Sequence, residues 1–432
     1  MKSIKNVLLV DYISEEVNEC LQMEHTPFYS LDKKNEQLSF VQLAFNHPLY
    51  IMYSSGTTGK PKSIVHSAGG TILQHKKELI LHTGLCEGDT IFYFTTCGWM
   101  MWNWLVSSLS IGSTIVLYDC NPFYPNELSL LNLIDDCEIN YFGTSAQYIS
   151  SLEKNKIYPK IHSNYKSLKS ILSTGSTLTD DNYDFVYSEW KKDVHLASIS
   201  GGTDIISCFV LGNQMLPVYK GKIQCIGLGM DVKSYDKSGE EKYDFKGELV
   251  CAKPFPSMPI YFWGDKENVK YKEAYFSQYE NVWTHGDFIS IDIRGQVQIF
   301  GRSDATLNPG GVRIGTAEIY SVIDKMNEIK DSVVIQTVVE SDDKIVLFVI
   351  TDNTILDDNL IDLIKFNIRS NCSPRHVPHF VIDVPDIPYT INGKKIEIAV
   401  KQAVHGEAIP NIDSISNPDS LSYFEDIDFI NA

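Results

Sequence analysis

The chain has 432 residues, of which 43% are hydrophobic and 21% are charged. This is the composition of a globular protein, and the length exceeds what one hydrophobic core normally supports, so two or three domains are expected. The formal net charge of −18 argues against a nucleic-acid partner, because phosphate backbones are bound by net basic surfaces. Any phosphate site must therefore be local.

The cysteines and the apolar runs restrict the compartment. Nine cysteines are scattered singly from Cys20 to Cys372, with no CxxC pair and no His/Cys spacing suited to zinc, which favours a reducing environment. The apolar run near the N-terminus is too short for a signal-peptide core, and no stretch reaches the roughly 18 apolar residues of a membrane span. We therefore expect a cytosolic protein without a membrane span.

Strand and helix patterns alternate in the first half of the chain. β-branched apolar runs at 4–10 and 49–53 predict buried strands, and helical spacing of apolar residues between His66 and His82 predicts a helix after the second. Such alternation predicts α/β layers. The same strand and helix patterns recur further on: strands at 90–94, 113–119 and 170–174, and helices near 99–111 and after Pro125.

The second half changes character after Gly221. Short strands with glycine turns, such as 247–252 and 295–301, predict a β-rich subdomain, and the polar, turn-rich segment 302–311 resembles a linker. Helix and strand patterns beyond it predict a small α+β domain, with a loosely packed tail from Gly406 onward. We thus expect a large domain of layered α/β sheets plus a β-rich subdomain at 1–303, followed by an α+β domain at 304–432.

The sequence SSGTTGKPK at 54–62 carries the clearest chemical signal. Its glycines and small hydroxyl residues let backbone N–H groups surround a phosphate, while Lys60 and Lys62 supply positive charge. It is not a Walker A loop, because Gly56 and Gly59 are only three residues apart and Pro61 stands where that motif needs a magnesium-binding hydroxyl. A surface Gly/Ser turn is the alternative, which the density of these residues after a predicted strand disfavours.

This loop resembles the ATP-binding loop of the adenylate-forming superfamily, which includes acyl-CoA synthetases, luciferases and the adenylation domains of peptide synthetases. The resemblance implies nucleotide contacts from Ser54, Ser55, Gly56, Thr57, Thr58, Gly59, Lys60 and Lys62. SGGTDI at 200–205 stands where the family has its Thr-Glu signature, which implies that Thr203 contacts the α-phosphate and Asp204 helps to hold Mg²⁺. Asp here replaces the usual Glu. Taken alone, the segment is equally consistent with a purely structural role, that of a Gly-Gly turn with an Asx cap.

Three further segments are similar to the family's nucleotide-binding motifs. THGDF at 284–288 implies that Asp287 accepts hydrogen bonds from the ribose hydroxyls. GRSDATLNPGGVRIG at 301–315 resembles the hinge motif, with Arg302 at the ribose, Asp304 at the pivot of a mobile C-terminal domain and Arg313 near the phosphate or the CoA entrance. GSTLTD at 175–180 corresponds to the adenine-side loop, so that Gly175, Ser176 and Thr177 are candidates, although a helix N-cap is an equal alternative.

PYTINGKKIEIAV at 388–400 resembles the loop that carries the family's catalytic lysine, here Lys394. Without that resemblance, Asn-Gly-Lys would predict only an exposed lysine in a two-residue turn. The order of the motifs along the chain favours the catalytic interpretation.

Segments between residues 45 and 406, including the Trp-rich stretch 95–119, resemble the branch of the superfamily that activates acetoacetate. The resemblance implies an acid–thiol ligase that uses ATP, Mg²⁺ and CoA, forms acetoacetyl-adenylate, and releases AMP and pyrophosphate. Trp99 and Trp102 are candidates for the acyl pocket. Because neighbouring positions of one helix cannot all face one cavity, at least two of Trp99, Trp102 and Trp104 are expected in the core.

The chain departs from the family in one respect. Family members carry a long segment before the phosphate loop, whereas this loop begins about fifty residues in. The resemblance therefore implies a shortened first subdomain, with exposed apolar surface and unpaired sheet edges. Two alternatives stay open: a synthetase for acetate, propionate or another short-chain acid, and a truncated, non-catalytic nucleotide-binding protein.

Overall fold

The computed structural model describes residues 4–10, 26–31, 37, 39–54, 62–303, 305–307, 314–339, 342–391, 393–409, 412–425 and 427. The chain forms two compact units, residues 1–43 and 44–432. In the first unit β1 (Leu8–Leu9) pairs in parallel with β2 (Thr26–Pro27), and the 3₁₀ turn η1 (Phe28–Ser30) follows. Leu8 is exposed, so the prediction of a long buried strand over 4–10 is wrong.

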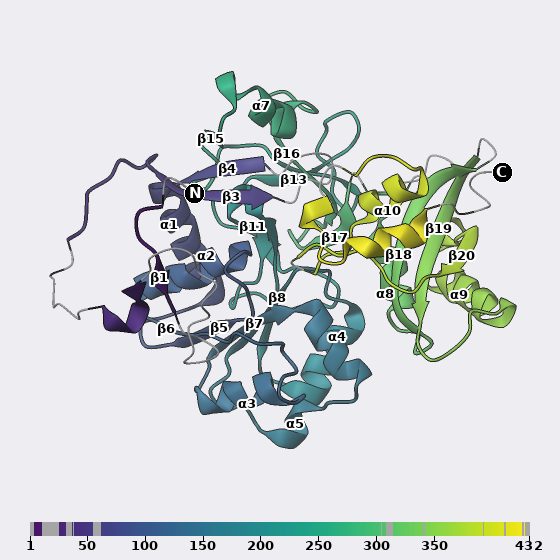
Figure 1. Ribbon diagram of the computed structural model, residues 1–432, viewed down its shortest axis with the longest axis horizontal. Coiled ribbons are helices and arrows are strands. Elements are labelled where there is room, and N and C mark those ends of the chain that lie inside the picture. The colour runs from purple at the N-terminus through teal and green to yellow at the C-terminus, as the bar shows by residue number, and fades with distance from the viewer. Residues whose placement is uncertain are drawn as a thin grey trace. The chain divides into compact units, whose positions relative to one another are not determined.

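The second unit contains a five-stranded parallel sheet. The predicted α/β layering is confirmed, because successive residues of these strands point into different hydrophobic cores on the two faces of the sheet. The first core contains Phe92, Phe142 and Ile171, and the second contains Ile91, Tyr141 and Leu172. The strands lie in the order β6 (Thr114–Val116), β5 (Thr90–Tyr93), β7 (Tyr141–Ser145), β8 (Ser170–Thr174) and β9 (His195–Ser198). Strands β6, β5, β7 and β8 are labelled in the lower part of Figure 1.

Helices contribute to both cores. Leu130, Ile149 and Tyr183 join the first core, and Leu79, Met101 and Leu105 join the second. Those of the first core are α3 (Ser129–Asp136), α4 (Ala146–Lys154), α6 (Asp180–Phe185) and the π-helical η4 (Val186–Trp190), near the short α5 (Pro159–His162). Those of the second are the π-helical η2 (Lys77–Thr83), which continues α1 (Ala68–Lys76), and also α2 (Met100–Ser107) and η3 (Ser108–Ile111).

A short antiparallel sheet carries the ends of the predicted phosphate loop. Its order is β15 (Tyr261–Phe262), β4 (Lys62–Ser67) and β3 (Pro48–Ser54). The strand predicted at 49–53 is confirmed, but it is an edge strand with Leu49, Ile51 and Tyr53 exposed rather than a buried one. The predicted order of strand, loop and helix is also incomplete, because β4 precedes α1.

The β-rich part predicted after Gly221 is present. One antiparallel sheet has the order β13 (Val232–Tyr235), β14 (Gly247–Cys251), β16 (Trp283–Ile291) and β17 (Val297–Arg302). A second contains β10 (Ser200–Gly202), β11 (Ser207–Leu211) and β12 (Cys225–Ile226), with the turn η5 (Thr203–Ile205) between its first two strands. The turn η6 (Lys266–Asn268) leads into helix α7 (Val269–Phe276), which packs Tyr271 and Tyr275 into the core of these sheets.

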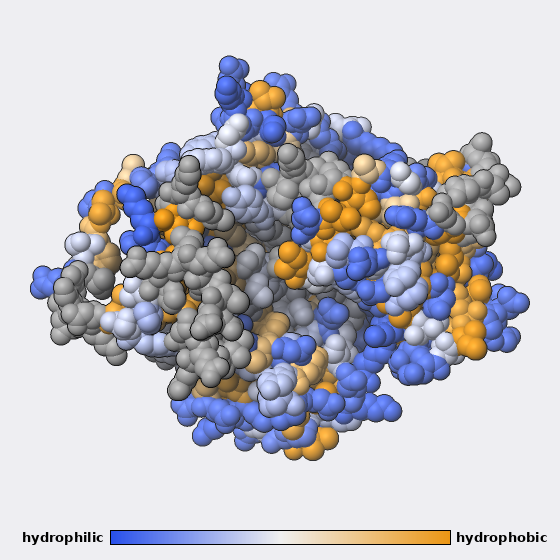
Figure 2. Space-filling view, viewed as in Figure 1, coloured by the Kyte–Doolittle hydropathy of each residue, from blue (hydrophilic) through white to orange (hydrophobic). Residues whose placement is uncertain are grey.

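The C-terminal part is a three-stranded sheet with helices on both faces. Its strands are β18 (Ile329–Val339), β19 (Asp342–Thr351) and β20 (Phe380–Asp383). One core includes α8 (Thr316–Ile323) and α9 (Asp358–Asn371), near the turn η8 (Pro374–His376), and the other includes α10 (Glu397–Val404). Figure 2 shows apolar residues in orange among hydrophilic ones in blue over this part, where Phe366 and Ile391 are exposed.

The end of the described chain is packed, which corrects the expected loose tail. The turns η9 (Ile412–Ser414) and η10 (Pro418–Phe424) follow α10, and Leu421 and Phe424 are buried in its core. The ring of Phe424 lies edge-on to Phe348 at 4.9 Å. No helix in the described part of the chain is both long and apolar enough to cross a bilayer.

Candidate functional site

Two loops with predicted roles leave the same edge of the central sheet. Gly175 directly follows β8, and the segment that leads to Thr203 follows β9, the strand beside it. The hydroxyl of Thr174 donates to the carbonyl oxygen of Ile199 at 2.8 Å and joins the two exits. Ligands of open α/β sheets bind at the carboxyl ends of parallel strands, so this edge is the place expected for a site.

The segment 175–180 after β8 contains the N-cap of a helix. Helix α6 is capped by Thr179, whose hydroxyl accepts from the amide of Asn182 at 3.4 Å. The N-cap alternative therefore applies to Thr179 and leaves residues 175–177 exposed beside the sheet edge. Gly175 has a φ of +97°, a conformation that other residues rarely adopt, so the chain can turn sharply here.

Thr203 lies in η5, and a buried histidine holds its backbone. His66 Nε2 lies 3.1 Å from the Thr203 carbonyl oxygen. Burial lowers the pKa of His66 to about 4, against a smaller opposing effect of the Thr203 carbonyl. At neutral pH the imidazole is therefore uncharged and can donate Nε2–H to this carbonyl. The Thr203 side chain is not used in this contact.

Asp204 is held by two donors from distant segments. The Lys62 ammonium lies 3.2 Å from its Oδ1, and the Tyr275 hydroxyl donates to the same oxygen at 2.6 Å. Burial alone would raise the pKa of Asp204, but Lys62, His285 and the hydrogen bond from Tyr275 lower it. The carboxylate is thus ionised at neutral pH. It is no Asx cap, since η5 has no side-chain hydrogen bond at its N-terminus.

Asp287 and Arg302 face each other across the β16–β17 pair. They are direct partners in the strand register, and the Arg302 guanidinium donates from Nη1 to Asp287 Oδ1 at 3.4 Å and to the His285 carbonyl at 3.2 Å. His285 Nε2 lies 3.7 Å from the other oxygen of Asp287. Burial lowers the pKa of His285, although Asp287 and Asp204 oppose this, so the ring carries no charge at neutral pH.

Lys394 lies in a tight turn at the start of the segment that leads to α10. Its amide donates to the Thr390 hydroxyl at 3.0 Å, and the Thr390 amide donates to its carbonyl at 2.8 Å. The residue as a whole is exposed, yet protein atoms around its ammonium lower the pKa; the charges of Asp287 and Asp204 raise it and that of Arg302 lowers it. These hydrogen bonds close a turn between Thr390 and Lys394, but Asn392 of the predicted Asn-Gly turn lies outside the described residues. The charges of three predicted site residues influence the pKa of the lysine.

Several predicted site residues lie outside the described residues: Ser55, Gly56, Thr57, Thr58, Gly59, Lys60, Asp304 and Arg313. The two ends of the predicted phosphate loop are described, and Ser54 pairs with Lys62 in the β3–β4 register. Lys62 therefore links this loop to Asp204.

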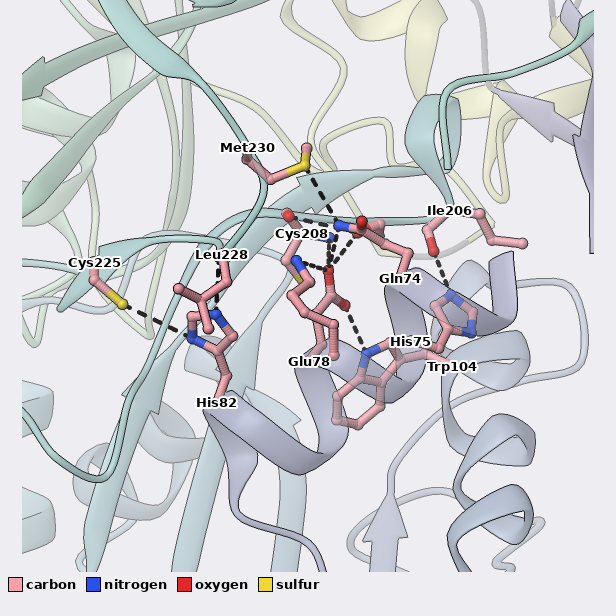
Figure 3. Close-up of polar contacts among 12 residues, drawn as sticks. Gln74, His75, Glu78, His82, Trp104, Ile206, Cys208, Cys225, Leu228 and Met230 are labelled. Atoms are coloured by element: carbon pink, nitrogen blue, oxygen red, sulfur yellow. Dashed lines mark hydrogen bonds and ion pairs between the residues drawn. The ribbon is translucent and has the colours of Figure 1, made fainter. Parts of the chain in front are cut away.

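Only one of the three tryptophans at α2 and its N-terminal cap is fully buried, whereas the spacing argument expected at least two in the core. Trp104 is fully buried and donates its indole N–H to Glu78 Oε2 at 2.9 Å, which makes it a core residue (Figure 3). Trp99 is half-buried and lies edge-on to Tyr93 with ring centres 6.2 Å apart. Trp102 is also half-buried. Trp99 and Trp102 stay predictions for the acyl pocket.

Sequence reasoning missed the residues that hold these groups in place. His66, Tyr275 and Glu78 belong to no recognised motif, and their partners lie far along the chain. His285 could have been noticed, because it stands two residues before Asp287 in the quoted THGDF segment.

The donors present fit a magnesium ion bound together with phosphates. Mg²⁺ commonly takes one or two carboxylates, with water and phosphate oxygens completing its shell. Within the described ranges no three His, Cys, Asp or Glu side chains form a metal cluster. Asp204, an ionised carboxylate beside the phosphate-loop residue Lys62, is the residue that could hold such an ion.

Comparison with known proteins gives one family and a consistent group of relatives. Residues 2–262 match the family described as AMP-binding enzyme. Acetoacetyl-coenzyme A synthetase of Rhizobium meliloti (strain 1021) is 51% identical over 388 residues, covering 90% of this chain and 60% of the relative. Acetoacetyl-CoA synthetase of Gallus gallus is 44% identical over 439 residues, covering 99% of this chain and 66% of the relative.

A solved structure agrees with these relatives. Acetoacetyl-CoA synthetase from Streptomyces lividans superposes with a TM-score of 0.91 at 40% identity, covering 98% of this chain and 65% of that protein. The chain thus spans 60% to 66% of the length of these relatives.

Proposed function

The chain belongs to the family of AMP-binding enzymes, and from this premise we propose that it ligates acetoacetate to CoA at the expense of ATP. The reaction passes through acetoacetyl-adenylate and releases pyrophosphate and AMP. The observation that carries the proposal is the contact of Lys62, at the end of the predicted phosphate loop, with Asp204, whose Oδ1 lies 3.2 Å from the Lys62 ammonium. Asp287 and Arg302 are partners in the β16–β17 register, and the charges of Asp287 and Asp204 raise the pKa of Lys394 against the effect of burial. The choice of acetoacetate is supported by 51% identity to a relative with that specificity in its name.

In the first step a carboxylate oxygen of acetoacetate attacks the α-phosphorus of ATP, and the bond to pyrophosphate breaks. Asp287 and Arg302 bind the ribose, Thr203 contacts the α-phosphate, and the loop 54–62 holds the leaving pyrophosphate. Lys394 stabilises the charge that develops at phosphorus, an electrostatic effect that commonly contributes several kcal/mol. Asp204 would hold a Mg²⁺ ion, which would supply positive charge at the phosphate oxygens.

In the second step the CoA thiol attacks the acyl carbon and AMP leaves. The domains at 1–303 and 304–432 rotate about Asp304 between the two steps, which withdraws Lys394 once the adenylate has formed. The polar composition of the segment around residue 304 supports this hinge.

A panel of acids tests the substrate assignment. Pyrophosphate release is measured with acetoacetate, acetate and propionate, each with ATP, Mg²⁺ and CoA. We expect acetoacetate to give the highest kcat/KM, because the Trp-rich segment 95–119 resembles that of enzymes for this acid. Preference for acetate or propionate would transfer the assignment to another short-chain acid. Binding of ATP by calorimetry without any turnover would indicate a nucleotide-binding protein that lacks catalysis.

The isolated cysteines also support a location. Every described cysteine is a free thiol, as a reducing compartment requires. We place the reaction in the cytosol, with small molecules as its partners and without nucleic acid. Fractionation of cells that express the chain tests this, and recovery with an organelle would contradict it.

A further inference from the structure

Tyr275 is held rigidly by other aromatic rings. Only 2% of its surface is exposed. Its ring stacks on Trp283, with ring centres 3.7 Å apart and an angle of 15° between the planes, and Phe262 and Tyr271 pack against it edge-on at 5.6 and 5.4 Å. These contacts fix the position of the Tyr275 hydroxyl, because a packed ring has little rotational freedom.

The Tyr275 hydroxyl donates a hydrogen bond to one oxygen of the Asp204 carboxylate. It donates to Asp204 Oδ1 at 2.6 Å, and the Lys62 ammonium approaches the same oxygen at 3.2 Å while it lies 4.8 Å from the centre of the Tyr275 ring. From the described part of the chain, no hydrogen bond reaches the other oxygen, Oδ2. The two donors therefore orient the carboxylate by one oxygen and leave the second available.

We propose that Tyr275 is the positioning residue for Asp204: by fixing Oδ1, it presents Oδ2 to the metal ion that accompanies ATP. The inference rests on the proposed function, in which Asp204 helps to hold Mg²⁺. Residues that orient a metal-binding side chain through a hydrogen bond are often as important for affinity as the side chain itself. The short side chain of Asp makes this support important, because it cannot reach as far as Glu.

The aromatic stack also relates the two carboxylates of the site. Trp283, on which Tyr275 stacks, is the first residue of β16, and Asp287 lies further along the same strand. One packed unit thus fixes the donor for Asp204 and the strand that carries the proposed ribose-binding residue. Such preorganisation lowers the cost of ordering the site when the nucleotide binds.

The test is the affinity for ATP with and without Mg²⁺, measured by calorimetry on the wild-type chain, Tyr275→Phe and Tyr271→Phe. Tyr275→Phe should lose about 10- to 100-fold of Mg·ATP affinity and little of the affinity measured in EDTA. Tyr271→Phe is the matched control: it removes a hydroxyl from the same helix and the same ring cluster, but that hydroxyl donates to the Pro259 carbonyl at 3.1 Å. It should behave as wild type.

A second variant separates positioning from simple packing. Asp204→Glu should bind Mg·ATP poorly while the Tyr275 hydroxyl is present, because that hydroxyl occupies the space the longer side chain needs. The double variant Asp204→Glu/Tyr275→Phe should regain at least part of the lost affinity. Lack of any recovery would indicate that the hydroxyl does not set the carboxylate position.

The outcomes distinguish this inference from the proposed function. Wild-type Mg·ATP affinity in Tyr275→Phe overturns the inference and leaves the proposed function standing. Equal loss with and without Mg²⁺, or equal loss in Tyr271→Phe, also overturns it, because the hydroxyl would then matter only for packing. Failure of the wild-type chain to bind ATP in either condition overturns the proposed function as well.

Discussion

The environment of Lys394 sets the pH range of its ammonium form. Burial lowers the pKa below the ordinary 10.5, Asp287 and Asp204 offset this in part, and Arg302 adds to it. The proposed role needs the protonated amine, so adenylate formation should persist below the lowered pKa and fall as the pH rises through it. In Lys394→Arg the alkaline limb should move upward, because a guanidinium stays charged above about pH 12. A pH–rate profile of adenylate formation measures the alkaline limb of wild type and of Lys394→Arg. Alkaline limbs at the same pH in the two proteins would contradict the assignment.

Removing the amine should affect only one half-reaction. Lys394→Ala should lower the rate of adenylate formation by at least ~100-fold. It should leave thioester formation from supplied acetoacetyl-adenylate within about twofold of wild type, since the role proposed for Lys394 is confined to the first step. The two half-reactions are measured separately, with the exposed Lys401→Ala as the matched control. Equal loss in both half-reactions would refute the role.

At the residue scale, sequence motifs identified charged groups but not what holds them. Asp204, Asp287, Arg302 and Lys394 were all candidates by resemblance, and the structure couples them electrostatically. Their individual roles stay predictions. Tyr275 could not be found in this way, because its hydrogen bond to Asp204 spans 71 positions of the chain and depends on how α7 packs. A local pattern carries no information about such a partner.

At the element scale, a buried polar cluster ties η2 to its neighbours. Glu78 is fully buried and accepts hydrogen bonds from Gln74, the Ser207 hydroxyl, the Cys208 amide and the Trp104 indole, and Figure 3 shows the side chains converging. The Lys77 ammonium lies 3.5 Å from the same carboxylate. The cluster joins α1, α2 and β11, and β11 follows the turn that contains Thr203 and Asp204.

Trp104→Phe tests this cluster. The change removes one hydrogen bond to a buried carboxylate and should cost about 1.5–3 kcal/mol of unfolding free energy beyond the loss from reduced ring size. Trp99→Phe controls for ring size, because Trp99 is only half-buried. Urea unfolding followed by circular dichroism compares the midpoints. Equal midpoints for the two variants would show that the bond to Glu78 contributes nothing.

The backbone of Ile206, in the same region, adopts an unusual conformation. Its φ of +47° is rare for a β-branched residue, and His75 Nε2 contacts its carbonyl oxygen at 2.5 Å. This strained residue directly follows η5, so it helps to set where Thr203 and Asp204 lie. Nothing in the local sequence predicts a left-handed isoleucine, because only the tertiary contacts sustain it.

The packed end of the described chain gives a further prediction. Phe424→Ala should cost about 3–5 kcal/mol, because it opens a cavity beside Phe348. Tyr423→Ala is the neighbouring control, since that ring is 45% exposed, and should change stability by about 0.5 kcal/mol or less. Thermal unfolding of both variants measures the difference. A small effect of Phe424→Ala would support the original expectation, from the acidic composition, that the tail is loosely packed.

Elements with strong periodic patterns were predicted well. Strands β8 and β14 lie where their patterns indicated, and helices and strands make up the C-terminal part as expected. The burial of β3 was predicted wrongly because an apolar run shows strand propensity but not whether a neighbouring strand covers it. Strand β4 was not predicted, because the short run Lys62–Ser67 directly adjoins the glycine-rich loop and shows no strand pattern distinct from it.

At the scale of the whole molecule, charged contacts join the C-terminal part to the sheets before it. Lys246 lies 2.5 Å from Glu318, Lys325 lies 2.8 Å from Asp181, and the Lys154 ammonium donates to the Ile329 carbonyl at 2.6 Å. Polar contacts of this kind can be exchanged at low cost, as a rotation between half-reactions requires. The boundary at 303/304 stays a prediction.

Glu318 makes this junction sensitive to acid. Burial alone would raise its pKa, but His376, whose Nε2 lies 3.5 Å from its Oε2, and hydrogen bonds from Lys246 and the Gly315 amide lower it to about 2, from an ordinary 4.5. A carboxyl with a lowered folded-state pKa stabilises the protein above its unfolded pKa, and this contribution is lost as the pH falls through the folded value. Wild type should therefore exceed Glu318→Gln in stability above pH 4.5 and approach it toward pH 2.

Urea midpoints at several pH values measure this difference, with the exposed Glu407→Gln as the control that should follow wild type throughout. A gap between wild type and Glu318→Gln that does not change with pH would show that Glu318 acts through packing alone.

The central claim is that the chain activates acetoacetate on the α-phosphate of ATP. The most direct measurement is exchange of labelled pyrophosphate into ATP, with Mg²⁺ present and CoA omitted, for wild type and Lys394→Ala. The account predicts exchange that depends on acetoacetate in wild type and is lost in the variant. Exchange that does not depend on acetoacetate, or that persists unchanged without the Lys394 amine, would contradict this claim.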